Sequence, residues 1–574
     1  MKQFFTLLAA VLFTATTLAQ GNLTVTSNVV CTIDPKGSLT VNGNFLNTEG
    51  GTVILNSSST NFSSIIVKGI AKGDIVYYRF VNSHAATGGG YWDLVGSPVS
   101  SPIPSQENPG SEDLMEISDF VSSNKFNLHR VEETDSPPVN EIDYTYAIGL
   151  YENDIDEFAY YSTAVGDEGG FPSQGLQVHP KTFVTARGYA MATANVTGQI
   201  VKYWGGVRTS DYMANLDYHN VIDPVTNQNM VTWNLVSNPF PSYINGNESL
   251  GTGTKNFLDE NANAFDQGDF WGVYRWTGNE YTPYNLSTPA FYIAPGQGFF
   301  VASREPGIDP ENPNQNIQTE VNFFKEMRTI SGGDDFITGA PILLNYRLAL
   351  KLYNADVEQA KTNFYFKNGL TLGLDPGYDA GAFNQTTKLS TRLAQGSQET
   401  AFSINAMDIN SLENARVPLE IRQNAGQAFR VSMADMELPE NTYVYLEDTL
   451  NGTVTSLNDG DFELTALSDL SGAERFFIIF KDNSLLSNGD TLGIDALNIY
   501  KANIDSFITI AGITPDLGKL DVTVYNILGM TVREKALNPA TTTQRVFTDG
   551  LASGLYVVQV RSANQIFNKK IIIE

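Results

Sequence analysis

The chain has 574 residues, which is longer than one hydrophobic core usually organises, and this length predicts roughly three to four domains. Hydrophobic residues make up 42% of the chain and charged residues 17%, so the composition excludes a globally disordered polymer. The formal net charge of -28 argues against nucleic acid and anionic lipid as partners, because both would repel so negative a surface.

The first residues have the pattern of a secretory signal peptide. Lys2 precedes an apolar stretch from Phe4 to Phe13, and small residues lead up to Ala19. The pattern predicts a signal peptide over residues 1–19, cleaved between Ala19 and Gln20. The apolar stretch is shorter than the roughly 20 residues of a membrane span, and no later segment is longer. The sequence therefore predicts an exported chain without a transmembrane segment.

Residues 20–87 contain three short alternating segments, "NLTVTSN", "SLTVNGN" and "TVILNSS". Leu23 and Leu39 are 16 residues apart, and Val53 follows 14 residues later. Each segment ends in Asn, Gly or Ser, which are turn residues. The spacing predicts a β-rich segment, either a few rungs of a solenoid or an ordinary meander.

Residues 88–318 contain an internal repeat. The segment "YWDLVGSPVSSPI", which starts at Tyr91, matches "TWNLVSNPFPSYI", which starts at Thr232, in its Trp, Leu, Val and Pro positions. A glycine-aromatic segment follows each of them, "ARGYAMATA" from Ala186 and "PGQGFFVAS" from Pro295. Alternation places Trp and Leu on one face of a strand, and Pro ends the ladder. The repeat predicts two related β units.

Two further β modules are predicted after the linker "REPGIDPENPNQN". Residues 319–487 contain strand-like runs from "YRLALKLYN" to "RFFIIFKD", at the spacing of a β-sandwich. Residues 495–574 divide into seven short strands that start near Leu497, Ser506, Leu520, Met530, Gln544, Leu555 and Gln565. The predicted fold class is all-β: a multidomain chain of β-sandwich and β-meander modules that ends in a seven-stranded Ig-like sandwich. Beyond the signal peptide, helix is expected only in a short stretch near Asn256.

Three segments near the end of the chain occur in a recognisable order: "VYNILGMTVREKAL", "FTDGLASGLYVVQV" and "FNKKIIIE". They resemble the C-terminal sorting domain (type A) of the type IX secretion system of Bacteroidetes. An Asn-Pro pair that many members carry near the start of the domain is replaced here by "NIYKANIDSF". The positions that match the family pattern are Gly529, Leu551, Gly554, Tyr556, Val558, Val560, Lys569 and Lys570.

The resemblance implies a route for the protein. In the family, a signal peptide directs export across the inner membrane, and the secretion machinery then recognises the folded tail and moves the protein to the outer surface. The tail is commonly cleaved, and the body is joined to lipopolysaccharide. A secreted or outer-surface location, reached via the periplasm, is therefore expected.

Recognisable catalytic motifs are missing from the sequence. The four histidines form no His-Glu-x-x-His zinc motif, and no Gly-x-Ser-x-Gly elbow or phosphate-binding loop occurs. Asp375 and Asp379 in "LDPGYD" could bind calcium, but Asp-Pro-Gly is more simply a β-turn. No catalytic residue, cofactor or metal site is predicted, although a carboxylate pair distant in sequence stays open.

The densest aromatic run, "DFWGVYRWTGNEYTPYN", contains Trp271, Tyr274, Trp276, Tyr281 and Tyr284. Such rings can present flat faces to sugars, and the alternative is that half of them fill a core. "WNLVSNPFPS" and "IAPGQGFFV" also resemble segments of large surface proteins of the same bacteria. The sequence thus predicts a non-catalytic adhesion or glycan-binding protein, with surface glycans or lipopolysaccharide as partners. The alternative is an exported hydrolase acting on polysaccharide or protein.

Overall fold

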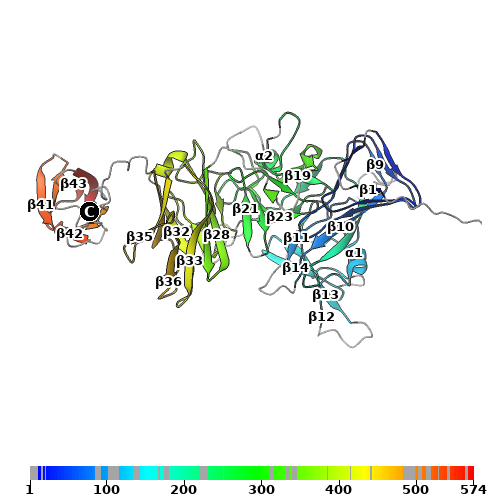
Figure 1. The fold of residues 1–574 in the computed structure, drawn as a ribbon, viewed down its shortest axis with the longest axis horizontal. Helices are drawn as coiled ribbons and strands as arrows, with labels where there is room; N and C mark the ends of the chain where they lie inside the picture. The colour runs from blue at the N-terminus through cyan, green and yellow to red at the C-terminus, as the bar shows by residue number, and fades with distance from the viewer. Residues whose placement is uncertain are drawn as a thin grey trace, which may run out of the picture. The chain divides into compact units, whose positions relative to one another are not determined.

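The computed structural model contains two compact units, Met1–Lys481 and Asp482–Glu574, called the body and the tail below. Strands dominate both units (Figure 1), which confirms the predicted all-β class. None of the helices in the described part is long and apolar enough to cross a membrane. The structure describes residues 11–13, 17–19, 21–84, 92–100, 115–133, 142–165, 169–172, 180–219, 231–249, 251–278, 280–310, 316–330, 337–338, 346–383, 385–413, 415–439, 442–482, 498–501, 507–511, 513, 519–527, 529–538, 543–562 and 566–573.

The body begins with a parallel β-solenoid whose rungs have three strands each. Alternate side chains point inward, and Ile33, Val41 and Leu55 are fully buried. The first sheet stacks β1 (Val11–Phe13), β4 (Val30–Ile33) and β7 (Thr52–Asn56); the second stacks β2 (Thr17–Ala19), β5 (Ser38–Val41) and β8 (Ser64–Val67); the third stacks β3 (Leu23–Val25), β6 (Phe45–Asn47) and β9 (Ala71–Lys72).

Asparagines connect one corner of successive rungs. The Asn22 Oδ1 accepts the backbone N–H of Asn44 at 2.8 Å, and the Asn44 Oδ1 accepts that of Ile70 at 2.9 Å. These amides satisfy backbone donors at a corner where no ladder partner is present. β1 and β2 lie within the predicted signal peptide, so cleavage after Ala19 would leave β3 as the first strand of the solenoid.

The long strand β10 (Asp74–Val81) joins the solenoid to the first of two similar β units. It runs parallel to β7 and antiparallel to β16 (Gln199–Gly206). The strands that lie between β10 and β16 in the sequence form a separate sheet, with the order β11-β15-β13-β12 and with β14 beside β13. We call β10 to β16 the first copy. Its other elements are β11 (Asp93–Val95), α1 (Ile117–Asn124), β12 (Arg130–Glu132), β13 (Tyr144–Glu152), β14 (Glu157–Ser162) and β15 (Tyr189–Met191).

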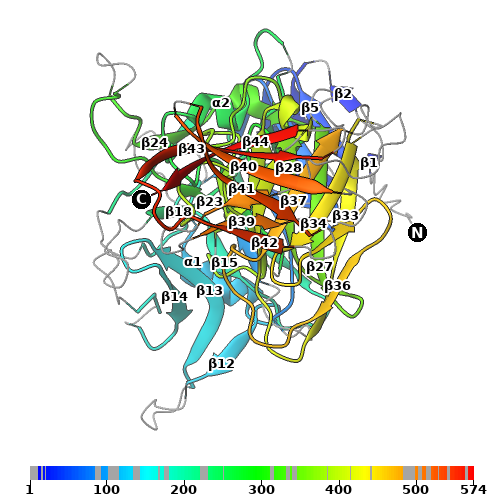
Figure 2. The same ribbon diagram turned by 90° about the vertical axis from the view of Figure 1, so that its left-hand side faces the viewer.

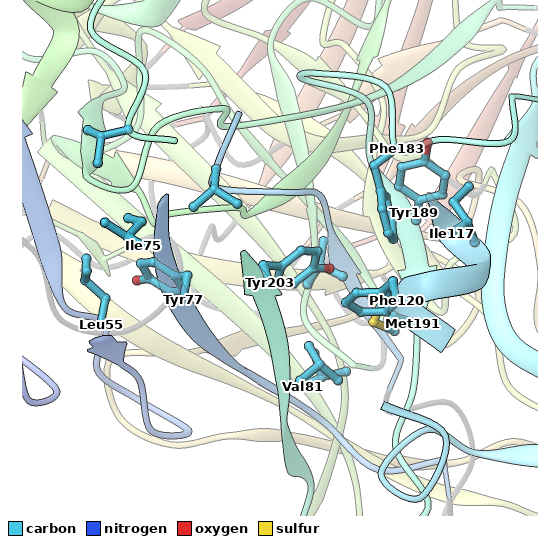
Figure 3. Close-up of a cluster of buried hydrophobic side chains, with 14 of the residues drawn as sticks. Leu55, Ile75, Tyr77, Val81, Ile117, Phe120, Phe183, Tyr189, Met191 and Tyr203 are labelled. Atoms are coloured by element: carbon cyan, nitrogen blue, oxygen red, sulfur yellow. The ribbon is translucent and has the colours of Figure 1, made fainter. Parts of the chain in front are cut away.

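Helix α1 was not anticipated from the sequence. Ile117 and Phe120 are buried at helical spacing, and the Phe120 ring lies 4.8 Å from that of Tyr203 on β16. Figure 3 shows these rings together, with Ile117 beside Phe183 and Tyr189. The helix has only eight residues and follows a proline-rich segment, so its periodicity is a weak signal.

The second copy runs from β17 to β24 and continues past residue 318, because β24 pairs with β17. Its main sheet has the order β18-β23-β20-β21, and a second sheet has the order β25-β19-β22-β26. The elements of the copy are β17 (Tyr212–Asn215), β18 (Trp233–Ser237), β19 (Tyr243–Asn245), α2 (Phe257–Asn261), β20 (Val273–Trp276), β21 (Tyr281–Tyr284), β22 (Phe291–Ile293), β23 (Gly298–Ala302) and β24 (Glu320–Phe323). The copy is followed by η1 (Lys325–Met327), β25 (Arg328–Thr329) and β26 (Ile337–Thr338).

The two copies pair their strands in the same register. In each copy the glycine-aromatic strand lies between the Trp-x-Leu-Val strand and a third strand. The order is β11-β15-β13 in the first copy and β18-β23-β20 in the second. The equivalent trios of neighbouring residues are Leu94–Ala190–Gly149 and Leu235–Phe300–Tyr274. The repeat therefore extends from sequence to strand pairing.

The copies also contact each other reciprocally. Val95 forms a β-bridge with Gln297, and Val236 forms one with Arg187. Val95 is equivalent to Val236, and Gln297 is equivalent to Arg187, by the register given above. Each copy therefore gives the other the same contact, as subunits do in a twofold-symmetric dimer.

The rest of the described body, from residue 346 onward, forms one eleven-stranded sheet that we call the sandwich module. The sheet curls onto itself, because Phe462 near one end lies 5.9 Å from Phe476 near the other, ring centre to ring centre. Its strands are β27 (Tyr346–Asn354), β28 (Val357–Phe366), β29 (Ala380–Gly381), β30 (Leu389–Thr391), β31 (Phe402–Met407), β32 (Arg416–Ile421), β33 (Ala428–Glu437), β34 (Thr442–Asp448), β35 (Thr453–Ser456), β36 (Phe462–Thr465) and β37 (Phe476–Asp482), with η2 (Ile409–Glu413) after β31.

The tail contains two sheets around one core, drawn in orange to red in Figure 2. The sheet orders are β38-β39-β42 and β41-β40-β43-β44. Val522 on β40 and Val558 on β43 are buried between them, whereas Asp521 is exposed, as alternation predicts. The strands are β38 (Asn498–Tyr500), β39 (Phe507–Ala511), β40 (Leu520–Asn526), β41 (Thr531–Leu537), β42 (Thr543–Phe547), β43 (Gly554–Arg561) and β44 (Ile566–Ile573).

Candidate functional site

A cavity of about 330 Å³ lies between the second copy and the sandwich module. One wall is β21 with the loop after it, and the other is formed by β27, β28 and β33. We call this cavity the cleft. The polar and aromatic side chains that line it are Thr282, Tyr284, Thr288, Arg347, Lys361, Asn363, Tyr365 and Asp435.

Alternation along β28 builds one wall of the cleft. Lys361, Asn363 and Tyr365 lie on one face of the strand and line the cleft. Phe364, between them, points the other way and is fully buried in the sandwich core. The strand thus serves a core with one face and the cleft with the other.

A β-bulge directs a carboxylate into the cleft. The pairing of β33 with β27 shifts register opposite residues 347–349. Asp435 lies in this bulge at φ +46, a left-handed conformation that costs about 1–3 kcal/mol in a residue other than glycine. Its carboxylate meets the Lys361 ammonium at 2.8 Å, and this hydrogen bond holds the pKa of Asp435 below its usual range. Bulges and strained backbone of this kind are concentrated near functional sites.

The opposite wall carries the Tyr284 ring, which packs on Phe291 with 4.9 Å between ring centres. Thr282 precedes it by two residues, so both lie on the same face of β21. At the other side of the cleft, Arg347 forms an ion pair with Glu437 at 3.3 Å. Both cations of the cleft are therefore paired with an acid, and the cleft is polar without a large net charge.

The five aromatic residues that were predicted from the sequence as ligand contacts lie in different environments. Trp271 and Tyr274 are buried in hydrophobic cores, so their ring faces are not available to a ligand. Trp276 and Tyr281 pair across β20 and β21 and are half-buried. Of the five, Tyr284 lines the cleft.

Glu280 stands just before β21 and has an altered acidity. Burial, together with repulsion from Glu358, raises its pKa to about 7, and Lys361 acts in the opposite direction. Lys361 also lines the cleft, so Glu280 belongs to the same electrostatic neighbourhood. A carboxyl group that keeps its proton near neutral pH can donate a hydrogen bond as well as accept one.

The carboxylates considered for calcium are engaged in a turn. Asp379 accepts the backbone N–H groups of Ala406 and Asp375, both at 2.7 Å, and burial raises its pKa to about 7. Asp375 accepts the N–H of Thr371 at 2.6 Å, and Gly377 between the two acids has φ +85. Among the described residues, no group of three or more His, Cys, Asp or Glu side chains is placed to hold a metal ion.

The predicted sorting residues lie in the tail as follows. Gly529 occupies the turn between β40 and β41 at φ +76, and Gly554 opens β43. Lys569 and Lys570 are exposed on β44. Leu551, Tyr556, Val558 and Val560 contribute to the tail core. At the other end of the chain, Ala19 ends β2, and Gln20 lies outside the described residues.

Several residues of the cleft were not singled out from the sequence. Arg347, Lys361, Asn363 and Asp435 are separated by up to 88 positions and meet only through strand pairing. One local signal was present: in "KTNFYF" from Lys361, polar residues occupy alternate positions that face away from the buried phenylalanines. Such a strand has a polar face that a neighbouring module can cover.

Two family models match the chain. One, described as "Domain of unknown function (DUF8693)", matches residues 8–480, and the other, described as "Secretion system C-terminal sorting domain", matches residues 503–574. No curated protein matches the chain. The second match confirms the predicted sorting domain.

Two solved structures share a distant likeness with the chain. The BSP domain of a biofilm associated protein is 10% identical, over 82% of this chain and 99% of that chain, with a TM-score of 0.15. The extracellular domain of BT4673 from B. thetaiotaomicron is 10% identical, over 76% of this chain and 79% of that chain, with a TM-score of 0.11. Scores this low carry no argument about fold or function.

The family matches assign the body and the tail separately. The sorting domain implies contact with the type IX secretion machinery and export to the cell surface or the medium. The chain belongs to the DUF8693 family and carries a Bacteroidetes sorting domain that directs it through the type IX secretion system.

Proposed function

We propose that the body is a non-catalytic glycan-binding or adhesion module, and that the cleft binds a neutral sugar unit. One observation supports this most. The partly exposed Tyr284 lines a cavity of about 330 Å³ together with Asn363, the Lys361–Asp435 pair and Tyr365, whose ring is mostly buried in the core behind it. Ligand cavities of this size combine apolar or aromatic walls with a few polar groups that fix orientation.

The charges of the cleft favour a neutral ligand over an acidic one. Lys361 is already paired with Asp435, and Arg347 with Glu437. An acidic polymer would have to displace these carboxylates, whereas sugar hydroxyl groups can bond to both partners of an intact pair. Surface glycans and the neutral sugars of lipopolysaccharide are the partners that fit this chemistry.

A hydrolase is the second candidate, and Glu280 is the observation that favours it. A carboxyl group with a pKa of about 7 is suited to act as a general acid. Glycoside hydrolysis also needs a second carboxylate as base or nucleophile. Asp435, the carboxylate that lines the cleft, is bound to Lys361, so we rank binding above hydrolysis.

A glycan array probed with the purified full-length protein tests the proposal. We expect binding to neutral glycans, and Tyr284→Ala or Asn363→Ala should weaken it at least about tenfold, a loss typical of a central contact residue. Tyr443→Ala is the matched control, because Tyr443 is a half-buried tyrosine on β34 outside the cleft. Unchanged binding by both cleft variants would refute the assignment.

The same arrays distinguish binding from hydrolysis. Release of reducing ends by the wild-type protein, and its loss in Glu280→Gln, would establish the hydrolase instead. Binding without release in both proteins is the result we expect.

We also propose that residues 1–19 act as the signal peptide. The supporting pattern is Lys2 followed by the apolar stretch and small residues. N-terminal sequencing of the exported protein should begin at Gln20, and a start upstream of Val11 would show that β1 and β2 stay in the solenoid.

A further inference from the structure

The tail has an apolar tip that its own core does not use. Ile527 and Met530, in the turn between β40 and β41, are 75% and 57% exposed, and Leu555 at the start of β43 is 42% exposed. Asn526 pairs with Tyr556, so Ile527 and Leu555 follow as the next opposed positions of the β40–β43 ladder. We call Ile527, Met530 and Leu555 the tip.

Hydrogen bonds connect the described residues around the tip. The Asn526 carbonyl accepts the N–H of Gly529 at 2.9 Å, and the Asn526 Oδ1 accepts the N–H of Met530 at 3.0 Å. Gly529 takes φ +76, which residues with a Cβ rarely adopt. On the neighbouring strand, the Tyr556 hydroxyl donates to the Ala552 carbonyl at 2.7 Å. The described residues that carry or flank the apolar side chains are therefore held by hydrogen bonds.

The tail also differs from the body in charge. The residues from 482 onward include nine acidic and eight basic side chains, against 54 acidic and 27 basic side chains before them. A receptor that attracted acidic groups would bind the body more strongly than the tail. A positively charged receptor for the tail is therefore disfavoured, and the tip offers apolar contact instead.

We propose that the tip docks into an apolar recess on a protein of the type IX secretion machinery. Methionine and aliphatic side chains at the centre of an interface act as anchors, because they lose contact with water on binding. Ile527 and Met530 lie beside Gly529, and Leu555 lies within residues 551–560; both regions carry the sorting pattern. The side chains of the tip do not belong to the tail core. The proposal rests on the sorting domain and is independent of the cleft.

The test uses the full chain, produced in a cell that has the type IX secretion machinery. The variant Ile527→Ser, Met530→Ser, Leu555→Ser removes the apolar contact without touching a buried residue. We expect its surface level to fall at least about tenfold, with accumulation in the periplasm, as for the loss of interface anchors. Phe547→Ser is the matched control, since Phe547 is 58% exposed on the other sheet of the tail. Normal surface levels of the serine variant, or an equal loss in Phe547→Ser, would overturn the proposal.

A second variant separates apolar contact from shape. Ile527→Leu, Met530→Leu, Leu555→Ile keeps the apolar surface and should be exported within about twofold of the wild type, as volume-conserving exchanges are tolerated best. Failure of this variant to reach the surface would overturn the proposal.

Thermal unfolding checks that the serine variant remains folded. We expect its melting temperature to shift by less than about 4 °C, because the replaced side chains are exposed. If the tail melts below the growth temperature, the three single serine variants take its place. Normal export of all three would overturn the proposal.

Discussion

The two copies of the β unit are held to their last strands by the same hydrogen bonds. In the first copy, the Asn124 side chain at the end of α1 accepts the N–H of Lys202 at 2.8 Å and donates to its carbonyl at 3.1 Å. In the second copy, Asn261 at the end of α2 makes the same two bonds to Asn322, at 2.6 and 3.0 Å. Both asparagines are almost fully buried.

The copies differ in what covers their outer strand. Gly149 and Tyr274 are equivalent positions, and they pair with Tyr160 and Pro283 respectively. The next residues along the outer strands, Tyr161 and Tyr284, are therefore equivalent too. Tyr161 is 3% exposed and packs against Phe171, whereas Tyr284 stays partly exposed and lines the cleft. The two copies thus share the asparagine hydrogen bonds to their last strands, whereas their outer strands lie in different environments. Four pairs of substitutions test this.

Replacing Tyr161 with alanine should have the largest effect. Loss of a buried aromatic ring costs about 3–5 kcal/mol of unfolding free energy, because its contacts disappear and a cavity remains. Tyr284→Ala should cost roughly 1 kcal/mol, since that ring already meets solvent. Urea unfolding followed by near-ultraviolet circular dichroism measures both changes. Equal losses would mean that the two positions do not differ in packing.

Replacing the buried asparagines should come next. Asn124→Ala and Asn261→Ala each leave buried backbone groups without partners, at about 2–3 kcal/mol. Asn261→Ala should be the more costly, because the Asn261 Oδ1 also accepts the side-chain amide of Gln318 at 3.2 Å. The exposed residue Asn368 provides the control, and Asn368→Ala should change the unfolding midpoint very little. A loss of unfolding free energy in only one of the two variants would show that only one copy depends on its asparagine hydrogen bonds.

A smaller effect is expected where the copies meet. Ala186 and Gly296 are equivalent, and both have positive φ, +60 and +64. A Cβ at Gly296 would lie 2.6 Å from the Gly96 carbonyl oxygen, so Gly296→Ala should destabilise the body by about 1–2 kcal/mol. Ala186→Gly relieves the left-handed conformation and should stabilise the body by about 0.5 kcal/mol. The same urea titration measures both variants, and opposite signs to these would show that the copies are strained differently.

The smallest effect should be on pH dependence. The pKa of Glu280 is about 7 in the folded protein, above its ordinary value of 4.5, so the folded state binds this proton more tightly than the unfolded state. Its contribution to stability is therefore complete below about pH 4.5 and is lost as the pH rises to about 7. Glu280→Gln should flatten the change of the urea midpoint across this window, by a modest amount because the group is only partly buried.

Glu157 supplies the control for this experiment, because it is the equivalent residue in the first copy and is exposed. Glu157→Gln should leave the slope as in the wild type. Burial also raises the pKa of Asp379 to about 7. Asp379 therefore maintains part of the pH dependence of the urea midpoint in every variant. An unchanged slope in Glu280→Gln would contradict the raised pKa.

Much of the tail could be predicted from the sequence. Its strands begin at residues 498, 507, 520, 531, 543, 554 and 566, each within one residue of the predicted position. The faces were also predictable, since Val522 and Val558 are buried as alternation required. The cleft could be predicted only in part: Tyr284 belonged to the aromatic run, whereas Asp435 enters through a bulge that no local pattern indicated.

The sequence by itself determined the all-β class, the sorting tail and the repeated Trp-x-Leu-Val segment. These features depend on side-chain alternation, turn residues and motif spacing, which act over a few neighbouring positions. Only the tertiary structure decided that Trp271 and Tyr274 fill cores, that residues 117–124 form a helix, and that Tyr284 and Asp435 line the same cleft. The physical reason is that an alternating strand has two faces, and its neighbours in space decide whether each face meets a core, a cleft or water.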